Sequence, residues 1–174
     1  MNTKEKNLKS VLKIIVPILI IGVILGIIIV KNNQQKLVAN TTDEFALDAT
    51  AIDLEQLKSY GLPIVIDFGA DSCVPCKEMA PVLKKLNKEM QGKAIVKFVD
   101  VWKNKNAADN FPVDLIPTQF YFDKDGNPFV PKDADAMKMK LYSTKDTNKH
   151  VYTAHEGGMT EAQLRAVLKE MGVE

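Results

Sequence analysis

The stretch VIDFGADSCVPCKEMAP, Val65–Pro81, decides the fold because it joins an apolar run to a helical pattern through two closely spaced cysteines. The β-branched run at residues 63–68 is typical of a short buried strand. After it, apolar side chains recur at helical spacing, at Cys76, Met79, Leu83, Leu86 and Met90. We therefore expect Cys73 at the start of a helix and Cys76 one turn further on.

Beyond this stretch, the hydrophobic pattern predicts further helices and strands. A helix at residues 53–60 precedes the first strand. After the cysteine helix we expect two more strands (94–101 and 118–123), a turn at DGN (125–127), a closing strand (150–157) and a last helix. Thr160 and Gln163 form a capping box at the start of that last helix. A parallel β-α-β unit followed by an antiparallel hairpin makes a three-layer α/β domain.

A surplus segment interrupts the expected hairpin. Residues 128–148 are more than a hairpin connection normally needs. We interpret the segment as a solvated loop or an extended hairpin, and a role in gripping a partner is the alternative.

Charge and cysteine content exclude two classes of protein. The 174-residue chain has a net charge of +1, but residues 1–39 hold six basic residues and one acidic residue, so the remainder carries −4. A mildly acidic domain without a basic stripe is a poor candidate for binding nucleic acid. Because the chain has only two cysteines, it is not a disulfide-stapled scaffold.

The N-terminal part predicts a membrane anchor. Residues 14–30 form an uncharged apolar run of 17 residues, which reaches 20 when it is extended back to Val11. A helix of that length spans roughly 30 Å, the thickness of a bilayer core. A cleaved signal peptide is the alternative, but its apolar region would be shorter and the cleavage match at Leu37 and Ala39 is poor.

The resulting organisation has four parts. More lysines precede the apolar run than follow it, which favours a cytoplasmic N-terminus and an extracytoplasmic remainder. We predict a cytoplasmic N-terminus, a transmembrane signal-anchor helix, a linker and a folded domain with an insertion. Their boundaries are residues 1–10, 11–30, 31–44 and 45–174, with the insertion at about 128–148.

The cysteine pair indicates redox chemistry. At a helix N-terminus, free N–H groups and the helix dipole favour a thiolate, so we expect a lowered pKa for Cys73 and a nucleophilic role. Cys76, on the apolar stripe, would be buried, less acidic and placed to resolve a mixed disulfide. A zinc site needs four ligands, and His150 and His155 lack ligand spacing. A copper site on the two thiolates and an inert pair are the remaining alternatives.

The Val65–Pro81 stretch resembles the active-site segment of the thioredoxin family. The C-x-P-C-K-x-x-A-P run is specific, and the IPT sequence at residues 116–118 resembles the cis-proline loop of that family. The resemblance extends more loosely over residues 45–174. It implies a thioredoxin-like three-layer α/β/α fold with a mixed central sheet, which the predicted transmembrane helix precedes.

The resemblance also assigns substrate contacts. It implies a cis Ile116–Pro117 peptide bond that faces the cysteines, with Ile116 offering backbone groups to an extended substrate. The residues that flank the cysteines, Ser72, Val74 and Pro75, complete the expected substrate-binding set.

Asp67 is the expected acid–base residue. A carboxylate inside an apolar strand is costly to bury, so its pKa should rise toward neutrality and it could exchange a proton with Cys76. The family uses an aspartate at this offset in that way, and Lys97 matches the family lysine beside it. The alternatives are a strand-end Asp67 turned to water and an exposed edge-strand Lys97.

The sequence departs from the family at three positions of the active-site segment. Ser72 and Gly69 stand where thioredoxins have tryptophans, and Val74 stands where they have glycine between the cysteines. Loss of the aromatic side chains should leave a more open and polar groove. We interpret the lone Trp102, which lies elsewhere in the chain, as a packing residue.

These observations predict a membrane-anchored protein disulfide reductase that acts outside the cytoplasm. It would need no cofactor beyond a redox-active Cys73–Cys76 disulfide, and we expect a monomer. By analogy with anchored relatives, a transmembrane thiol carrier would donate electrons, and apocytochrome c or other exported proteins would accept them. The alternatives are an extracytoplasmic disulfide oxidase, a copper metallochaperone, and a redox-silent adaptor that binds a partner through residues 137–142.

Overall fold

A computed structural model of the chain describes residues 45–173. These residues form six strands, three α-helices and one 3₁₀ helix. In chain order the elements are β1 (Asp48–Ala49), α2 (Leu54–Ser59), β2 (Ile64–Gly69), α3 (Val74–Glu89), β3 (Ile95–Asp100), η1 (Lys105–Ala108), β4 (Thr118–Phe122), β5 (Met139–Ser143), β6 (His150–Glu156) and α4 (Glu161–Glu170). The predicted helices and strands are confirmed, and the 3₁₀ helix lies where we expect a short irregular or helical stretch between two strands, whereas the two-residue β1 was missed.

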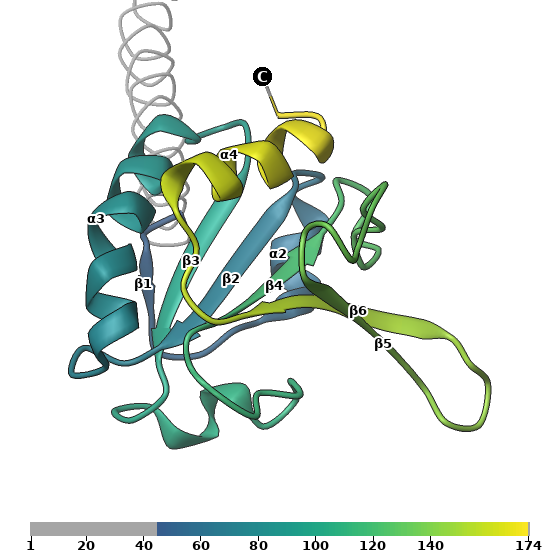
Figure 1. Ribbon diagram of the computed structural model, residues 1–174, viewed down its shortest axis with the longest axis horizontal. Coiled ribbons are helices and arrows are strands. Elements are labelled where there is room, and N and C mark those ends of the chain that lie inside the picture. Colours follow the sequence, from purple (N-terminus) through teal and green to yellow (C-terminus); the bar gives the residue numbers. More distant parts are fainter. Residues whose placement is uncertain (1–44, 174) are drawn as a thin grey trace, which may run out of the picture. The chain divides into compact units, whose positions relative to one another are not determined.

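The strands form one mixed sheet in the order β1-β3-β2-β4-β6-β5. β1, β3 and β2 run parallel, and β4 lies antiparallel to both β2 and β6. Helices α3 and α4 cover one face of the sheet and α2 covers the other, as Figure 1 shows. The predicted mixed-sheet, three-layer architecture is therefore correct.

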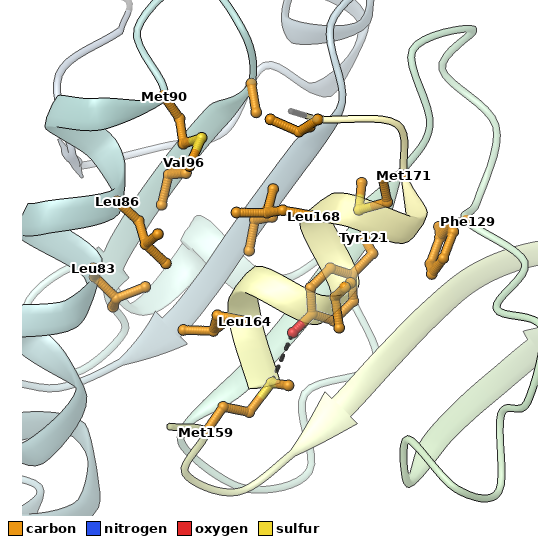
Figure 2. Packing of buried hydrophobic residues seen from close by; sticks show 14 of the residues in the cluster. Leu83, Leu86, Met90, Val96, Tyr121, Phe129, Met159, Leu164, Leu168 and Met171 are labelled. Atoms are coloured by element: carbon orange, nitrogen blue, oxygen red, sulfur yellow. Dashed lines mark hydrogen bonds between the residues drawn. The ribbon is translucent and has the colours of Figure 1, made fainter. Parts of the chain in front are cut away.

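The larger hydrophobic cluster lies between the sheet and the pair of helices α3 and α4 (Figure 2). The predicted apolar stripe of α3 is buried there, together with the inward side of α4. Tyr121 of β4 lies in the middle of this cluster, and its hydroxyl donates to Met159 Sδ at 3.0 Å. The predicted capping box of α4 is present, because the Thr160 and Gln163 side chains each bond to the other's backbone.

The insertion builds an additional strand. The segment 128–148 contains β5, which pairs antiparallel with β6. The segment therefore forms an extended hairpin and not a solvated loop. In Figure 1 the β5–β6 hairpin projects beyond the helices. The predicted closing strand at residues 150–157 is present as β6, the last strand in the chain, although β5 and not β6 forms that edge of the sheet. The DGN turn forms at Gly126 (φ 78°), but an isolated bridge rather than a strand follows it.

Within residues 45–173, no helix is both long enough and apolar enough to cross a membrane. The predicted signal anchor at 11–30 lies outside the described residues, as do the predicted N-terminus and linker.

Candidate active site

The two cysteines lie where β2 leads into α3. Cys73 is the N-cap residue of α3, and its extended backbone (φ −78°, ψ 127°) lets the helix begin at Val74. Cys76 follows one turn later on the buried stripe. Both are free thiols in a small buried cluster with Ala70, against which Ile116 packs. The pair therefore has one sulfur at the N-terminus of α3 and a second sulfur one turn further along the helix.

The cis-proline loop lies beside Cys73. The Ile116–Pro117 peptide bond is cis, as the resemblance implied, and the Ile116 carbonyl oxygen is 4.0 Å from Cys73 Sγ. The Pro117 carbonyl accepts a hydrogen bond from Gly157 N at 2.8 Å, which ties this loop to the segment after β6.

The flanking residues face solvent. Ser72, Val74 and Pro75 are exposed, whereas Pro117 is buried and Ile116 is half-buried. The surface around Cys73 therefore presents one hydroxyl and several apolar groups, which suits an extended peptide.

Asp67 lies buried behind the pair. Its side chain has no exposed surface, so the alternative of a strand-end carboxylate turned to water is wrong. Burial raises the pKa of the Asp67 carboxyl to about 7, although a hydrogen bond from Gln119 favours the ionised form. Gln119 Nε2 donates to Asp67 Oδ1 at 2.8 Å, whereas Oδ2 has no hydrogen-bond partner among the described residues.

The free oxygen of Asp67 and the sulfur of Cys76 face the same small space. A Cβ atom on Gly69 would lie 3.4 Å from Asp67 Oδ2 and 3.2 Å from Cys76 Sγ. Burial, the neighbouring Cys73 thiol and the Asp67 charge raise the pKa of the Cys76 thiol to about 12. Cys76 therefore holds its proton until a base takes it, and Asp67 is the base nearby.

The expectation that Lys97 neighbours Asp67 is wrong. In the parallel register Lys97 pairs with Ile66, and Asp67 pairs with Phe98. Because side chains alternate along a strand, Lys97 projects to the α2 face and Asp67 to the α3 face. The Lys97 ammonium donates instead to the Ala46 carbonyl at 2.8 Å.

Phe98 takes part of the space that an aromatic residue at position 69 would need. The hypothetical Cβ of Gly69 would lie 2.9 Å from Phe98 Cε2. A pocket of about 480 Å³ opens beside this ring, reaches Cys76 and is also lined by Leu83 and Lys103.

Trp102 is not a packing residue as expected, because 56% of its surface is exposed. Its backbone N–H donates to Asp100 Oδ1 at 3.0 Å, and Asp71 N–H donates to Oδ2 of the same carboxylate at 2.9 Å. Asp100 therefore links the loop after β3 to the loop that carries the cysteines.

Two polar residues of the site were missed. Gln119 contacts Asp67 directly, and His155 Nδ1 lies 3.2 Å from Gln119 Oε1. Their sequence signal is weak, because neither position stands out in its strand: Thr118 directly precedes Gln119 in β4, and β6 mixes polar and apolar residues throughout. Only the strand order shows that they meet.

A nucleophile position at a helix start, a resolving thiol and a buried acid define a dithiol exchange site. Among residues 45–173, no three or more His, Cys, Asp or Glu side chains are grouped to hold a metal ion. The class of protein is thus a thiol–disulfide oxidoreductase with the reactive pair on an α/β scaffold.

Comparison with known proteins gives the family. The thioredoxin family model matches residues 41–146, and the chain belongs to the thioredoxin family. Thioredoxin C-2 of Corynebacterium nephridii is 35% identical over 111 residues, which are 64% of this chain and 95% of that protein. The thioredoxin of Pseudomonas aeruginosa is 35% identical over 107 residues, 60% of this chain and 97% of its own.

A solved structure gives the same assignment. The X-ray structure of Fasciola hepatica thioredoxin is 28% identical, with a TM-score of 0.50, and the match covers 72% of this chain and 99% of that chain. Thioredoxins are thiol–disulfide oxidoreductases that act on protein thiols and disulfides through a cysteine pair and without a cofactor. This chain, which carries that pair at Cys73 and Cys76, is an enzyme of this kind.

Proposed function

We propose that this oxidoreductase is anchored by residues 11–30 and reduces disulfides of exported proteins, such as apocytochrome c, outside the cytoplasm. The apolar run and the lysines before it support the anchor and its orientation. Cytosolic thiols do not reach that compartment, so a transmembrane thiol carrier supplies the electrons.

The reaction proceeds in two exchanges. The Cys73 thiolate attacks one sulfur of the substrate disulfide; a Cys73–substrate bond forms and the other substrate sulfur leaves as a thiolate, which takes a proton from solvent. Cys76 then gives its proton to Asp67 and attacks Cys73 Sγ. The Cys73–Cys76 bond forms, the second substrate sulfur leaves, and the substrate disulfide has become two thiols.

The position of the cysteines carries this proposal: Cys73 caps α3, and buried Cys76 faces the free oxygen of Asp67. The reducing direction is supported by Pro75 in the first turn of α3. Proline has no N–H, so the helix start offers one donor fewer to a thiolate. A less stabilised thiolate makes the dithiol a stronger reductant.

Cysteine variants of the full-length chain test the chemistry. We expect Cys73→Ser to abolish reduction of a protein disulfide such as that of insulin, and Cys76→Ser to accumulate a mixed disulfide with the substrate. A Cys73→Ser variant that keeps turning over would refute the mechanism. Equilibration with glutathione tests the direction: a potential more negative than the glutathione couple is expected, and a less negative one would indicate an oxidase.

A membrane-impermeant maleimide tests the location. In intact cells it should label Cys73 of the reduced protein without lysis, and Cys73→Ser is the control for labelling of Cys76. Labelling that requires lysis would place the domain inside.

A further inference from the structure

Three buried polar side chains lie in one row across the sheet. Asp67 of β2 is the register partner of Gln119 in β4, and Gln119 is the register partner of His155 in β6. All three are buried. Gln119 Nε2 is 2.8 Å from Asp67 Oδ1, and Gln119 Oε1 is 3.2 Å from His155 Nδ1.

The hydrogen bonds of this row have one direction. Gln119 Nε2 faces three acceptors: Asp67 Oδ1, the Gly157 carbonyl oxygen at 3.2 Å and, at a longer 3.7 Å, Met79 Sδ. It is therefore the donor in these contacts. Gln119 Oε1 can only accept, which requires His155 Nδ1 to carry a hydrogen. His155 therefore fixes the orientation of the Gln119 amide, and the amide donates to the carboxyl group.

The inserted strand covers the outer end of the row. Met139 of β5 is the register partner of His155 on the side away from Gln119, and Met139 is itself buried. Without β5, His155 would lie on the edge strand of the sheet. The insertion thus helps to keep water away from the His155–Gln119 contact.

The charged and titratable groups around the row are few. Lys138, before β5, and Glu156 of β6 act on His155, whose pKa burial lowers. Glu156 is itself paired with Lys140 at 2.6 Å. Cys76 of α3 and Tyr121 of β4 are the titratable groups that Asp67 affects. None of these groups replaces Gln119 as a hydrogen-bond donor to Asp67 Oδ1.

The consequence is that the two oxygens of Asp67 differ. Oδ1 is held by Gln119, and Oδ2 faces the space that it shares with Cys76 Sγ. We propose that Gln119 and His155 are positioning residues that hold Asp67 by Oδ1, so that the carboxyl group exchanges the Cys76 proton at Oδ2. This inference rests on the proposed role of Asp67 in the exchange reaction.

The test is a direct titration of Asp67 in the reduced full-length chain, by NMR of ¹³C-labelled aspartate carboxyl groups with Asp67→Asn for assignment. Gln119→Met keeps an unbranched side chain and removes the donor to the carboxylate. Because a hydrogen bond to a charged group favours the charged form, we expect the pKa of Asp67 to rise by about one unit or more. The pH profile of mixed-disulfide resolution should move upward by the same amount.

A second pair of variants isolates His155. His155→Asn retains a side-chain N–H near the Nδ1 position and should keep the wild-type titration of Asp67. His155→Leu lacks the donor, and we expect a smaller upward shift than in Gln119→Met. This pair decides the question if Gln119→Met does not fold, because His155 lies at the outer end of the row.

The outcomes are distinct. An unchanged Asp67 titration in Gln119→Met, or the same titration in both His155 variants, would overturn the positioning role, even if stability falls. Failure of the proposed function would look different: Asp67→Asn would then resolve mixed disulfides at the wild-type rate, whatever the titration of Asp67 in the other variants.

Discussion

Each face of the central sheet buries a charged side chain, Asp67 on one and Lys97 on the other, and the surroundings of these two side chains differ. Asp67 of β2 and Lys97 of β3 are both almost fully shielded from solvent. On the α2 face, Lys97 donates to a backbone carbonyl at 2.8 Å. On the α3 face, Asp67 keeps one oxygen without a hydrogen-bond partner among the described residues, next to the Cys76 thiol.

The difference indicates which buried charged groups take part in catalysis. Burial alone raises the free energy of any charged group, and a structural charge is normally compensated by hydrogen bonds. An acid that stays partly uncompensated, with a pKa near 7 and a thiol in front of it, is arranged for proton exchange. Lys97 is similarly buried, but it lies on the other face of the sheet, away from the Cys76 thiol.

The largest expected effect is on the rate of mixed-disulfide resolution, which should depend on Asp67 and not on Lys97. Asp67→Asn removes the base that accepts the Cys76 proton, and we expect resolution of the mixed disulfide at pH 7 to slow by about 100-fold or more. Lys97→Met, on the opposite face, should leave that rate unchanged where the protein remains folded. Stopped-flow kinetics of a preformed mixed disulfide measures both, and equal slowing in both variants would invalidate the comparison.

The next effect is on stability. The pKa of Asp67 rises from 3.8 to about 7 on folding, so folding favours the protonated acid. The stability that this provides is complete below pH 4 and is lost as the pH rises through 7. Asp67→Asn does not lose stability in this way. We expect its free energy of unfolding to exceed that of the wild type by up to about 4 kcal/mol at pH 8, and by much less at pH 4.

Urea unfolding of both proteins at the two pH values measures this difference. A constant difference between wild type and variant would mean that Asp67 titrates alike in the folded and unfolded chain.

Local patterns were sufficient to predict most of the elements and the placement of the cysteines. The α3 stripe and the α4 capping box depend on residues a few positions apart, so their spacing can be read from the sequence. The face of Lys97 could not be read, because a one-residue change of register between β2 and β3 moves a side chain to the opposite face.

The Gln119–His155 contact was out of reach for a related reason. These residues are 36 positions apart, with the insertion between them, and they meet because β6, rather than β5, pairs with β4. The short β1 carries too few residues for any periodicity. The sequence therefore predicted well what neighbouring residues determine and missed what strand pairing determines.

The smallest expected effect tests how tightly the Asp67 face is packed. In Gly69→Ala the new Cβ would lie 2.9 Å from Phe98 Cε2 and 3.2 Å from Cys76 Sγ, so the ring or the helix must shift. Such overpacking costs about 1–3 kcal/mol, measured as a lower urea midpoint. Gly158→Ala is the matched control, since its Cβ would meet only Pro75 at 3.8 Å, an ordinary contact.

A second substitution identifies the cause of that loss. If the Phe98 ring is the obstacle, Phe98→Leu should be less destabilising in the Gly69→Ala background than alone, because the smaller side chain leaves room for the methyl group. Strictly additive effects would show instead that the methyl group is accommodated by moving Cys76. Resolution of the mixed disulfide would then slow in Gly69→Ala as well, since the space between Cys76 and Asp67 Oδ2 would have changed.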